Sequence, residues 1–120
     1  MPSGSKKCRL RLEAQFLKRT FKYCRSVLYD EEDKIWYDYN HVTETKNRNF
    51  YPSNLSPLYT MSHHDDLDLN ASVAKWSRLE AFNYSGGVPA SLERSGEQWD
   101  FPNVWPPLVE MVVTALENVS

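Results

Sequence analysis

One run near the C-terminal end dominates the sequence: Gln98-Trp99-Asp100-Phe101-Pro102-Asn103-Val104-Trp105-Pro106-Pro107. Its prolines stiffen the backbone, because each fixes φ at about −65° and restricts the residue before it. The tryptophans offer flat apolar faces, and the carboxylate and amides beside them offer hydrogen-bond partners. A sugar presents apolar C–H faces and a belt of hydroxyls, so the run fits a rigid carbohydrate platform. It also fits a buried aromatic loop that starts a helix, and composition alone leaves both interpretations open.

The chain continues from this run into a predicted helix over residues 104–119. Pro106 and Pro107 suit its first turn, where a missing backbone N–H costs little. Apolar residues then recur at spacings of three and four, which predicts one inward face. That face comprises Leu108, Met111, Val112, Ala115, Leu116 and Val119. Residues 88–95, before the run, are expected to form a loop.

Upstream, residues 10–29 predict a helix with a broad apolar stripe. The stripe comprises Leu12, Phe16, Phe21, Tyr23, Cys24, Val27 and Leu28. Residues 35–39 alternate and favour a strand, with Asn49-Phe50-Tyr51 as a candidate hairpin partner. Trp36, Tyr37 and Tyr39 in this segment are expected to pack within the hairpin.

Two more helices are expected between the hairpin and the loop. One spans residues 55–60 and is capped by Pro52-Ser53-Asn54. The other begins at Asp68 or Asn70, and its inner face carries Val73, Trp76 and Leu79. Gly86 and Gly87 are expected to stop it, since glycine commonly ends helices.

Composition narrows the class of protein. The 120 residues suffice for one small domain, and 14 Lys plus Arg against 16 Asp plus Glu argue against a nucleic-acid binder. No apolar run approaches the ~20 residues of a membrane span, so no membrane anchor is expected in this chain. Residues 1–9 are basic without a following apolar region, which indicates a disordered start rather than a signal peptide.

No metal site or cofactor is expected. His63-His64-Asp65-Asp66 combines metal-binding side chains, but adjacent positions point in different directions and lack the i, i+4 spacing of a zinc helix. A solvated loop is the better interpretation. Cys8 and Cys24 are too few for a metal motif and are expected to be free, although a disulfide between them stays open.

Four Asn-X-Ser sequons occur, at Asn54, Asn70, Asn83 and Asn118. Such sequons accept glycans only in a secreted protein. Several in a short chain hint at the secretory route, and chance occurrence explains them almost as well.

A family resemblance rests on longer motifs. The segment Gly96-Glu97-Gln98-Trp99-Asp100-Phe101-Pro102-Asn103-Val104-Trp105-Pro106-Pro107-Leu108 resembles the second signature of trehalases, which hydrolyse α,α-trehalose to two glucoses. Four upstream pieces agree in order: Tyr29-Asp30-Glu31-Glu32, Trp36-Tyr37-Asp38-Tyr39, Asn47-Arg48-Asn49-Phe50-Tyr51-Pro52-Ser53-Asn54-Leu55 and Gly86-Gly87-Val88-Pro89-Ala90-Ser91-Leu92. The likeness runs from about residue 12 to about residue 118. It is greatest to animal trehalases, whose full-length members are secreted or membrane-anchored glycoproteins.

The resemblance implies an all-α fold that is part of an (α/α)6 barrel, with aromatic-rich loops and room for one short β-hairpin. Residues 10–120 would form this partial helical domain. The family is similar to other inverting glycosidases, which use a carboxylic acid and a carboxylate base about 6.5–9.5 Å apart. Its acid stands in an upstream Gly-Trp-Asp motif and its base downstream, and neither motif occurs in these 120 residues. The resemblance therefore implies a trehalase fragment that is inactive alone; the alternative is an inactive carbohydrate-binding or protein-interaction fragment.

The predicted sugar-contact residues are Gln98, Trp99, Asp100 and Asn103, followed by Trp105, Asp38 and Tyr39. Trp99 would stack on the sugar, Gln98 would offer its amide, and Asp100 would accept sugar hydroxyls. Trp105 is expected rather in the core, and Asp38 and Tyr39 in packing. No catalytic residue is assigned, because Glu97 and Asp100 stand too close on one loop to act across a sugar. Trehalose or a related disaccharide is the expected ligand, and helix faces without neighbours predict self-association.

Overall fold

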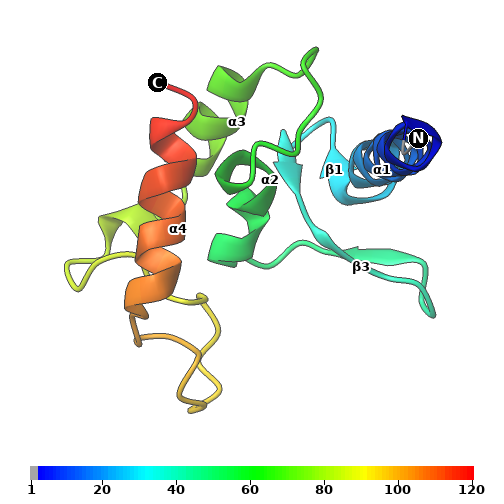
Figure 1. Cartoon of the computed structure of the whole chain (residues 1–120). Helices are drawn as coiled ribbons and strands as arrows, with labels where there is room; N and C mark the ends of the chain where they lie inside the picture. The colour runs from blue at the N-terminus through cyan, green and yellow to red at the C-terminus, as the bar shows by residue number, and fades with distance from the viewer. Residues whose placement is uncertain (1–2) are drawn as a thin grey trace.

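The computed structural model describes the backbone of residues 3–120 and the side chains of residues 13–120. The chain is mostly helical with two small antiparallel sheets (Figure 1). In chain order its elements are α1 (Ser3–Tyr23), the π-helical turn η1 (Cys24–Leu28), β1 (Tyr29–Asp30), β2 (Ile35–Trp36), β3 (Asp38–Asn40), β4 (Thr45–Asn47), the 3₁₀ turn η2 (Pro52–Leu55), α2 (Ser56–Tyr59), α3 (Leu69–Trp76), the 3₁₀ turn η3 (Glu80–Asn83) and α4 (Pro106–Glu117). The prediction of a mainly helical chain is confirmed, and two hairpins replace the single one expected.

The core gathers around Trp76 at the end of α3. Its side chain is fully buried, and its ring centroid lies 4.6 Å from that of Phe82 and 5.2 Å from that of Phe50. Leu58 of α2 is buried in the same cluster. Val112 of α4 joins it, because α2 and α4 lie side by side (Figure 1). The predicted inward face of α4 is thus confirmed at its centre.

Asn54 ties the hairpin region to the helical core. It is buried, its Nδ2 donates to the carbonyl of Trp36 at 2.7 Å, and its Oδ1 accepts from the Tyr51 amide at 2.8 Å. Both polar groups of the side chain are therefore satisfied within the fold, as buried amides require. This arrangement fixes the start of η2 and supports the short helix expected over residues 55–60.

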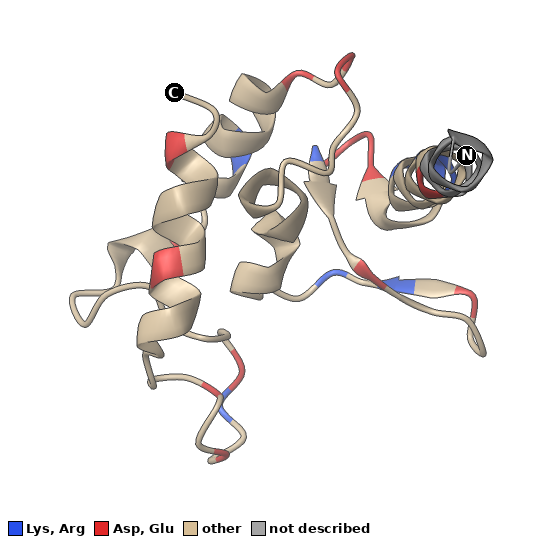
Figure 2. Cartoon of the chain, in the orientation of Figure 1, with Lys and Arg blue, Asp and Glu red and all other residues tan. Residues whose placement is uncertain are grey.

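A charge network holds the turn between β1 and β2, the acidic stretch seen in Figure 2. Buried Asp30 accepts from the amides of Glu32 and Asp33 and from Arg48 at 2.7 Å, while Lys46 lies 3.4 Å away. Burial raises the pKa of Asp30, but the Asp33 amide and the charges of Lys46 and Arg48 outweigh it and hold the pKa below its ordinary value. The network joins β4 to the first hairpin.

The prediction that Asn49-Phe50-Tyr51 pairs with residues 35–39 is wrong. β3 pairs antiparallel with β4, with Asp38 opposite Asn47. The chain returns early because Oδ1 of Asn40 accepts from the amides of Val42 and Thr43, which closes a tight turn. Phe50 is instead buried against Trp76. Trp36 and Tyr37 are buried as expected, but not in the expected hairpin: β2 pairs with β1, and the Trp36 ring centroid lies 4.9 Å from that of Tyr29.

The first helix differs from its prediction in both bounds and burial. It begins at Ser3, so residues 3–9, expected to be a disordered start, are helical, and a π-helical turn ends before Tyr29. Two residues of the predicted apolar stripe face solvent, Phe16 at 70% and Tyr23 at 58% exposed, whereas its later members in and near η1 are half-buried and Leu28 packs against the core. α1 stands apart from the group of α2, α3 and α4 (Figure 1), so the apolar residues of its middle, such as Phe16, do not reach the core.

α3 begins as predicted but ends early. Asp68 caps it by accepting from the Ala71 amide at 3.0 Å. The helix ends at Trp76, so the prediction that Gly86 and Gly87 end it is wrong. Leu79 is extended (φ −68°, ψ 146°), and this turn lets Phe82 pack edge-on against Trp76 at an interplanar angle of 76°.

Replacing Leu58 and replacing Phe16 by alanine should have very different effects. Leu58 is fully buried, so Leu58→Ala should lower the free energy of unfolding by about 2–5 kcal/mol. Phe16→Ala removes an exposed ring and should change it by no more than about 0.5 kcal/mol. Urea unfolding followed by tryptophan fluorescence measures both, and equal losses would contradict the burial assigned to these residues.

Candidate functional site

The platform loop, defined as residues 88–105, connects the region after η3 to α4 and lies near the start of α4 (yellow to orange in Figure 1). Two backbone hydrogen bonds close it on itself. The Ala90 amide donates to the Asn103 carbonyl at 3.0 Å, and the Phe101 amide donates to the Glu93 carbonyl at 2.9 Å. The loop is therefore a closed unit that presents the residues between these bonds.

Asp100 organises the interior of the platform loop. Its side chain is buried; Oδ1 accepts from Ser91 Oγ at 2.6 Å and Oδ2 accepts from Ser95 Oγ. The two serine oxygens in turn accept from the amides of Glu93 and Glu97, at 3.2 and 3.0 Å. The Ser91 bond, then the Ser95 bond, holds the pKa of Asp100 below its ordinary value of 3.8 against the smaller effect of burial. Asp100 is thus an ionised acceptor at neutral pH.

These serine bonds give Asp100 a structural role that the sequence did not suggest. Each oxygen already has one donor within the loop. A carboxylate has about four acceptor positions, so a further bond to a sugar hydroxyl is compatible with this arrangement. The sugar contact expected of Asp100 stays a prediction.

Trp99 is held outward beside this buried carboxylate. It is 56% exposed and borders an open hollow of about 190 Å³. The other lining residues are Tyr51, Pro52, Ser53, Ala90 and Leu108. The hollow therefore joins the platform loop to η2 and α4, segments far apart in sequence. The η2 residues were not predicted as site residues, although the Tyr51-Pro52-Ser53 motif carried part of the resemblance.

The remaining predicted residues of the loop lie around Trp99. Gln98 and Asn103 are exposed. Trp105 is 40% exposed, and its indole N–H donates to the Gln98 carbonyl at 3.1 Å. The expectation that Trp105 belongs to the core is therefore wrong, because its hydrogen bond ties it to the loop rather than to the cluster around Trp76.

Asp38 and Tyr39 lie elsewhere. Both belong to β3, whose hairpin projects away from the platform loop (Figure 1). Asp38 is exposed and Tyr39 is half-buried. The structure does not bring them to the hollow beside Trp99.

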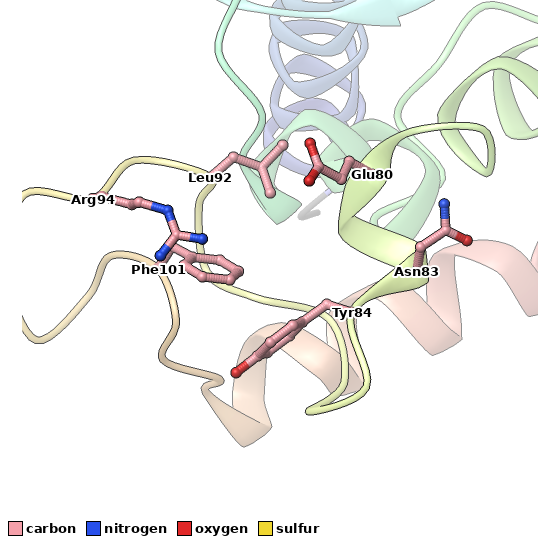
Figure 3. A pocket seen from close by; sticks show the side chains of 6 residues that line it. All are labelled: Glu80, Asn83, Tyr84, Leu92, Arg94 and Phe101. Atoms are coloured by element: carbon pink, nitrogen blue, oxygen red, sulfur yellow. The ribbon is translucent and has the colours of Figure 1, made fainter.

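Sequence reasoning missed a second hollow of about 260 Å³ (Figure 3). Its lining consists of Glu80, Asn83, Tyr84, Leu92, Arg94 and Phe101. The Arg94 guanidinium lies over the Phe101 ring, 4.2 Å from its centroid, and the Tyr84 ring centroid is 4.9 Å from that of Phe101. Phe101 thus points to this hollow, while Trp99, two residues earlier, borders the first.

The remaining sequence features, namely the His63–Asp66 stretch, the cysteines and the apolar helices, are described by their contacts. Asp66 pairs with Arg25 at 2.5 Å, and within residues 13–120 no group of three or more His, Cys, Asp and Glu could hold a metal ion. Cys24 is a free, half-buried thiol, and the Cys8 side chain lies outside the described residues. In the part of the chain that the structure describes, no helix is long and apolar enough to cross a bilayer.

Comparison with known proteins agrees with the sequence motifs. The family profile described as Trehalase matches residues 9–120. The chain belongs to the trehalase family. It is 46% identical to a trehalase of Bombyx mori over 97 residues, which cover 78% of this chain and 17% of that protein. It is 40% identical over 91 residues to a trehalase of Homo sapiens (76% and 16%) and 38% identical over 117 residues to one of Apis mellifera (89% and 18%). The chain thus spans less than a fifth of the length of these relatives, and the likeness to animal trehalases is confirmed.

Removing the Ser91 hydroxyl should change the titration of Asp100. Ser91→Ala deletes one of the two hydroxyl donors to the carboxylate, so the pKa of Asp100 should rise toward 3.8. The stability that Asp100 contributes is complete above pH 3.8 and is lost as the pH falls through the lower folded-state pKa. The variant should therefore lose this contribution at a higher pH.

NMR titration of the Asp100 side-chain carboxyl carbon measures the shift. Ser77→Ala, which removes a hydroxyl bonded to the Ala74 carbonyl on α3, is the control. An unchanged pKa in Ser91→Ala would show that the serine does not control the charge of Asp100.

Proposed function

We propose that this chain is part of a glycoside hydrolase that cleaves α,α-trehalose to two glucoses with inversion, and that it contributes one wall of the sugar pocket. The observation that carries this proposal is the position of Trp99. Its ring is exposed at a hollow while the adjacent Asp100 is buried and fixed by two serines. A loop held in this way presents an aromatic face with little freedom left to lose on binding.

The polar groups beside Trp99 support a sugar as the ligand. Gln98 and Asn103 are exposed, and their side-chain amides have no hydrogen bond within the part of the chain described. An amide offers both donors and an acceptor, which suits vicinal hydroxyls. We propose that Trp99 stacks on a glucose ring while Gln98 and Asn103 bind its hydroxyls. Asp100 would chiefly hold the loop in shape.

The role proposed for this chain is binding rather than proton transfer. A general acid at neutral pH needs a raised pKa, whereas the serine bonds lower the pKa of Asp100. Glu97 is exposed and stands on the same loop. An inverting reaction needs two carboxyl groups about 6.5–9.5 Å apart on opposite sides of the sugar. We therefore assign acid and base to other parts of a full-length family member.

We place the helices of this chain in the (α/α)6 barrel that the family resemblance implies. The predominance of helix and the position of the platform loop near the start of α4 support this placement (Figure 1). In such a barrel the loops at one end of the helices form the pocket. Because the family resemblance is to animal trehalases, we also propose that the intact protein is extracellular, secreted or anchored to a membrane.

Trehalose should bind the chain without being cleaved. Titration should change the tryptophan fluorescence, and Trp99→Ala should weaken binding about tenfold, since an aromatic contact is worth up to about 1.5 kcal/mol. Phe16→Ala, which removes a 70% exposed ring on α1, is the matched control and should leave the affinity unchanged. A glucose assay on the same samples should detect no product.

Two outcomes would contradict the proposal. A tryptophan fluorescence that does not change with added trehalose would contradict the proposed binding site at Trp99. Glucose release by the chain, above that of Asp100→Ala, would show that the carboxylates of this chain suffice for hydrolysis.

The exposed face of α1 favours a second, interaction-based role. Phe16 and Tyr23 are more than half exposed and Leu17 is half exposed, a concentration of apolar surface that normally has a partner. We propose that in the full-length fold other helices of the barrel cover this face. In the isolated chain the same face would then drive self-association.

Phe16→Glu should reduce this self-association. The substitution places a charge on the apolar face of α1, so sedimentation velocity should show a shift from oligomer toward monomer. Val42→Glu is the matched control, because Val42 is 79% exposed in the turn between β3 and β4. Equal effects of the two substitutions, or a monomeric parent chain, would refute the role of α1.

A further inference from the structure

The four Asn-X-Ser sequons differ sharply in their surroundings. Asn54 is 4% exposed, and its Nδ2, the atom that a glycan would occupy, donates to the Trp36 carbonyl at 2.7 Å. Because Asn54 is buried, a glycan on its Nδ2 would have no room and would push β2 and η2 apart. The fold therefore excludes a glycan at Asn54.

Two other sequons are constrained by their neighbours. Nδ2 of Asn118 donates to the carbonyls of Leu58 and Tyr59, at 2.9 and 3.3 Å. Asn70 is exposed in the first turn of α3, but Ser72, the hydroxyl residue of its sequon, is 1% exposed and faces the core. The helix thus separates the amide and the hydroxyl of this sequon, which a transferase must reach together.

Asn118 and its hydroxyl residue Ser120 are also exposed, but the Asn118 amide is hydrogen-bonded. Within residues 13–120, Asn83 is the sequon that combines an amide without a hydrogen bond with an exposed hydroxyl residue. It is the last residue of η3 and is exposed, and so is Ser85, the hydroxyl residue of its sequon. The intervening Tyr84 is extended (φ −78°, ψ 123°), which leaves the segment open to a transferase. Figure 3 shows the Asn83 amide pointing away from Arg94 and Phe101, and residues 13–120 provide its side chain with no hydrogen-bond partner.

We propose that Asn83 is the N-glycan acceptor of this chain and that Asn54 carries no glycan. The proposal is independent of trehalose binding, since it rests on exposure and hydrogen bonding at the sequons. The glycosyl donor is an oligosaccharide linked to a polyprenyl pyrophosphate. Nδ2 of Asn83 attacks C1 of the first sugar and forms the C–N bond. The C1–O bond to the pyrophosphate breaks, the pyrophosphate leaves with the electron pair, and the amide proton passes to a base of the transferase.

The test is translation of the full chain behind a cleavable secretory leader in the presence of endoplasmic-reticulum microsomes. Peptide N-glycosidase converts a glycosylated Asn to Asp, which mass spectrometry reads in the tryptic peptide of residues 79–94. We expect Asp at position 83 after this treatment and unmodified Asn at position 54. Treatment of the unglycosylated chain controls for spontaneous deamidation.

Two variants make the assignment specific. Asn83→Gln removes the acceptor, and Ser85→Ala keeps Asn83 but removes the hydroxyl of the sequon. Both should lose the gel shift due to glycosylation at residue 83, whereas Asn54→Gln should keep it. Three results would overturn the proposal. The parent chain could keep Asn at position 83, the Ser85→Ala variant could still show Asp there after peptide N-glycosidase, or Asp could appear at position 54.

Discussion

The candidate site depends on one buried carboxylate. Asp100 accepts hydrogen bonds from Ser91 and Ser95, and these serines in turn accept from the amides of Glu93 and Glu97. One ionised side chain thereby fixes both ends of the turn that carries Trp99. A buried charge is stable only when it is paired or well hydrogen-bonded, so the loop and the charge require each other.

The scaffold beneath the loop explains where the hollow forms. α4 begins at Pro106, and its Leu108 lines the hollow. Val112 and Ala115 of the same helix are buried in the core. η2 supplies the opposite side, and its position depends on the two hydrogen bonds of Asn54. The hollow beside Trp99 therefore lies where two separately anchored segments meet the platform loop. That arrangement suits a binding wall, because neither side has to be ordered by the ligand.

The parts of the fold that local patterns describe could be predicted, and the parts that depend on distant partners could not. The period of α4 correctly indicated Val112 and Ala115, and Asp68, one of the two caps that the sequence left open, begins α3. The stripe of α1 indicated an amphipathic helix, but a pattern cannot say whether its partner is present. The return at Thr45 depends on the side chain of Asn40, which accepts from the amides of Val42 and Thr43, and a strand pattern does not show such a turn.

In the candidate site, too, residue types and motifs could be predicted, whereas contacts between residues could not. Trp99 and its neighbours were recognisable from residue types and from family motifs. Ser91, Ser95 and the η2 residues were not, because their roles arise from side-chain contacts that the closed loop creates. Trp105 resembled a core residue by composition, yet its indole N–H braces the loop at Gln98.

Amide hydrogen exchange of Asp100→Ala against the parent chain tests the central claim most directly. If Asp100 holds the platform loop, the amides of Ala90, Glu93, Glu97 and Phe101 should exchange faster in the variant, while those of α4 beyond its first turn should keep their protection. Unchanged exchange throughout residues 88–105 would contradict the account, and so would a uniform increase over the whole chain.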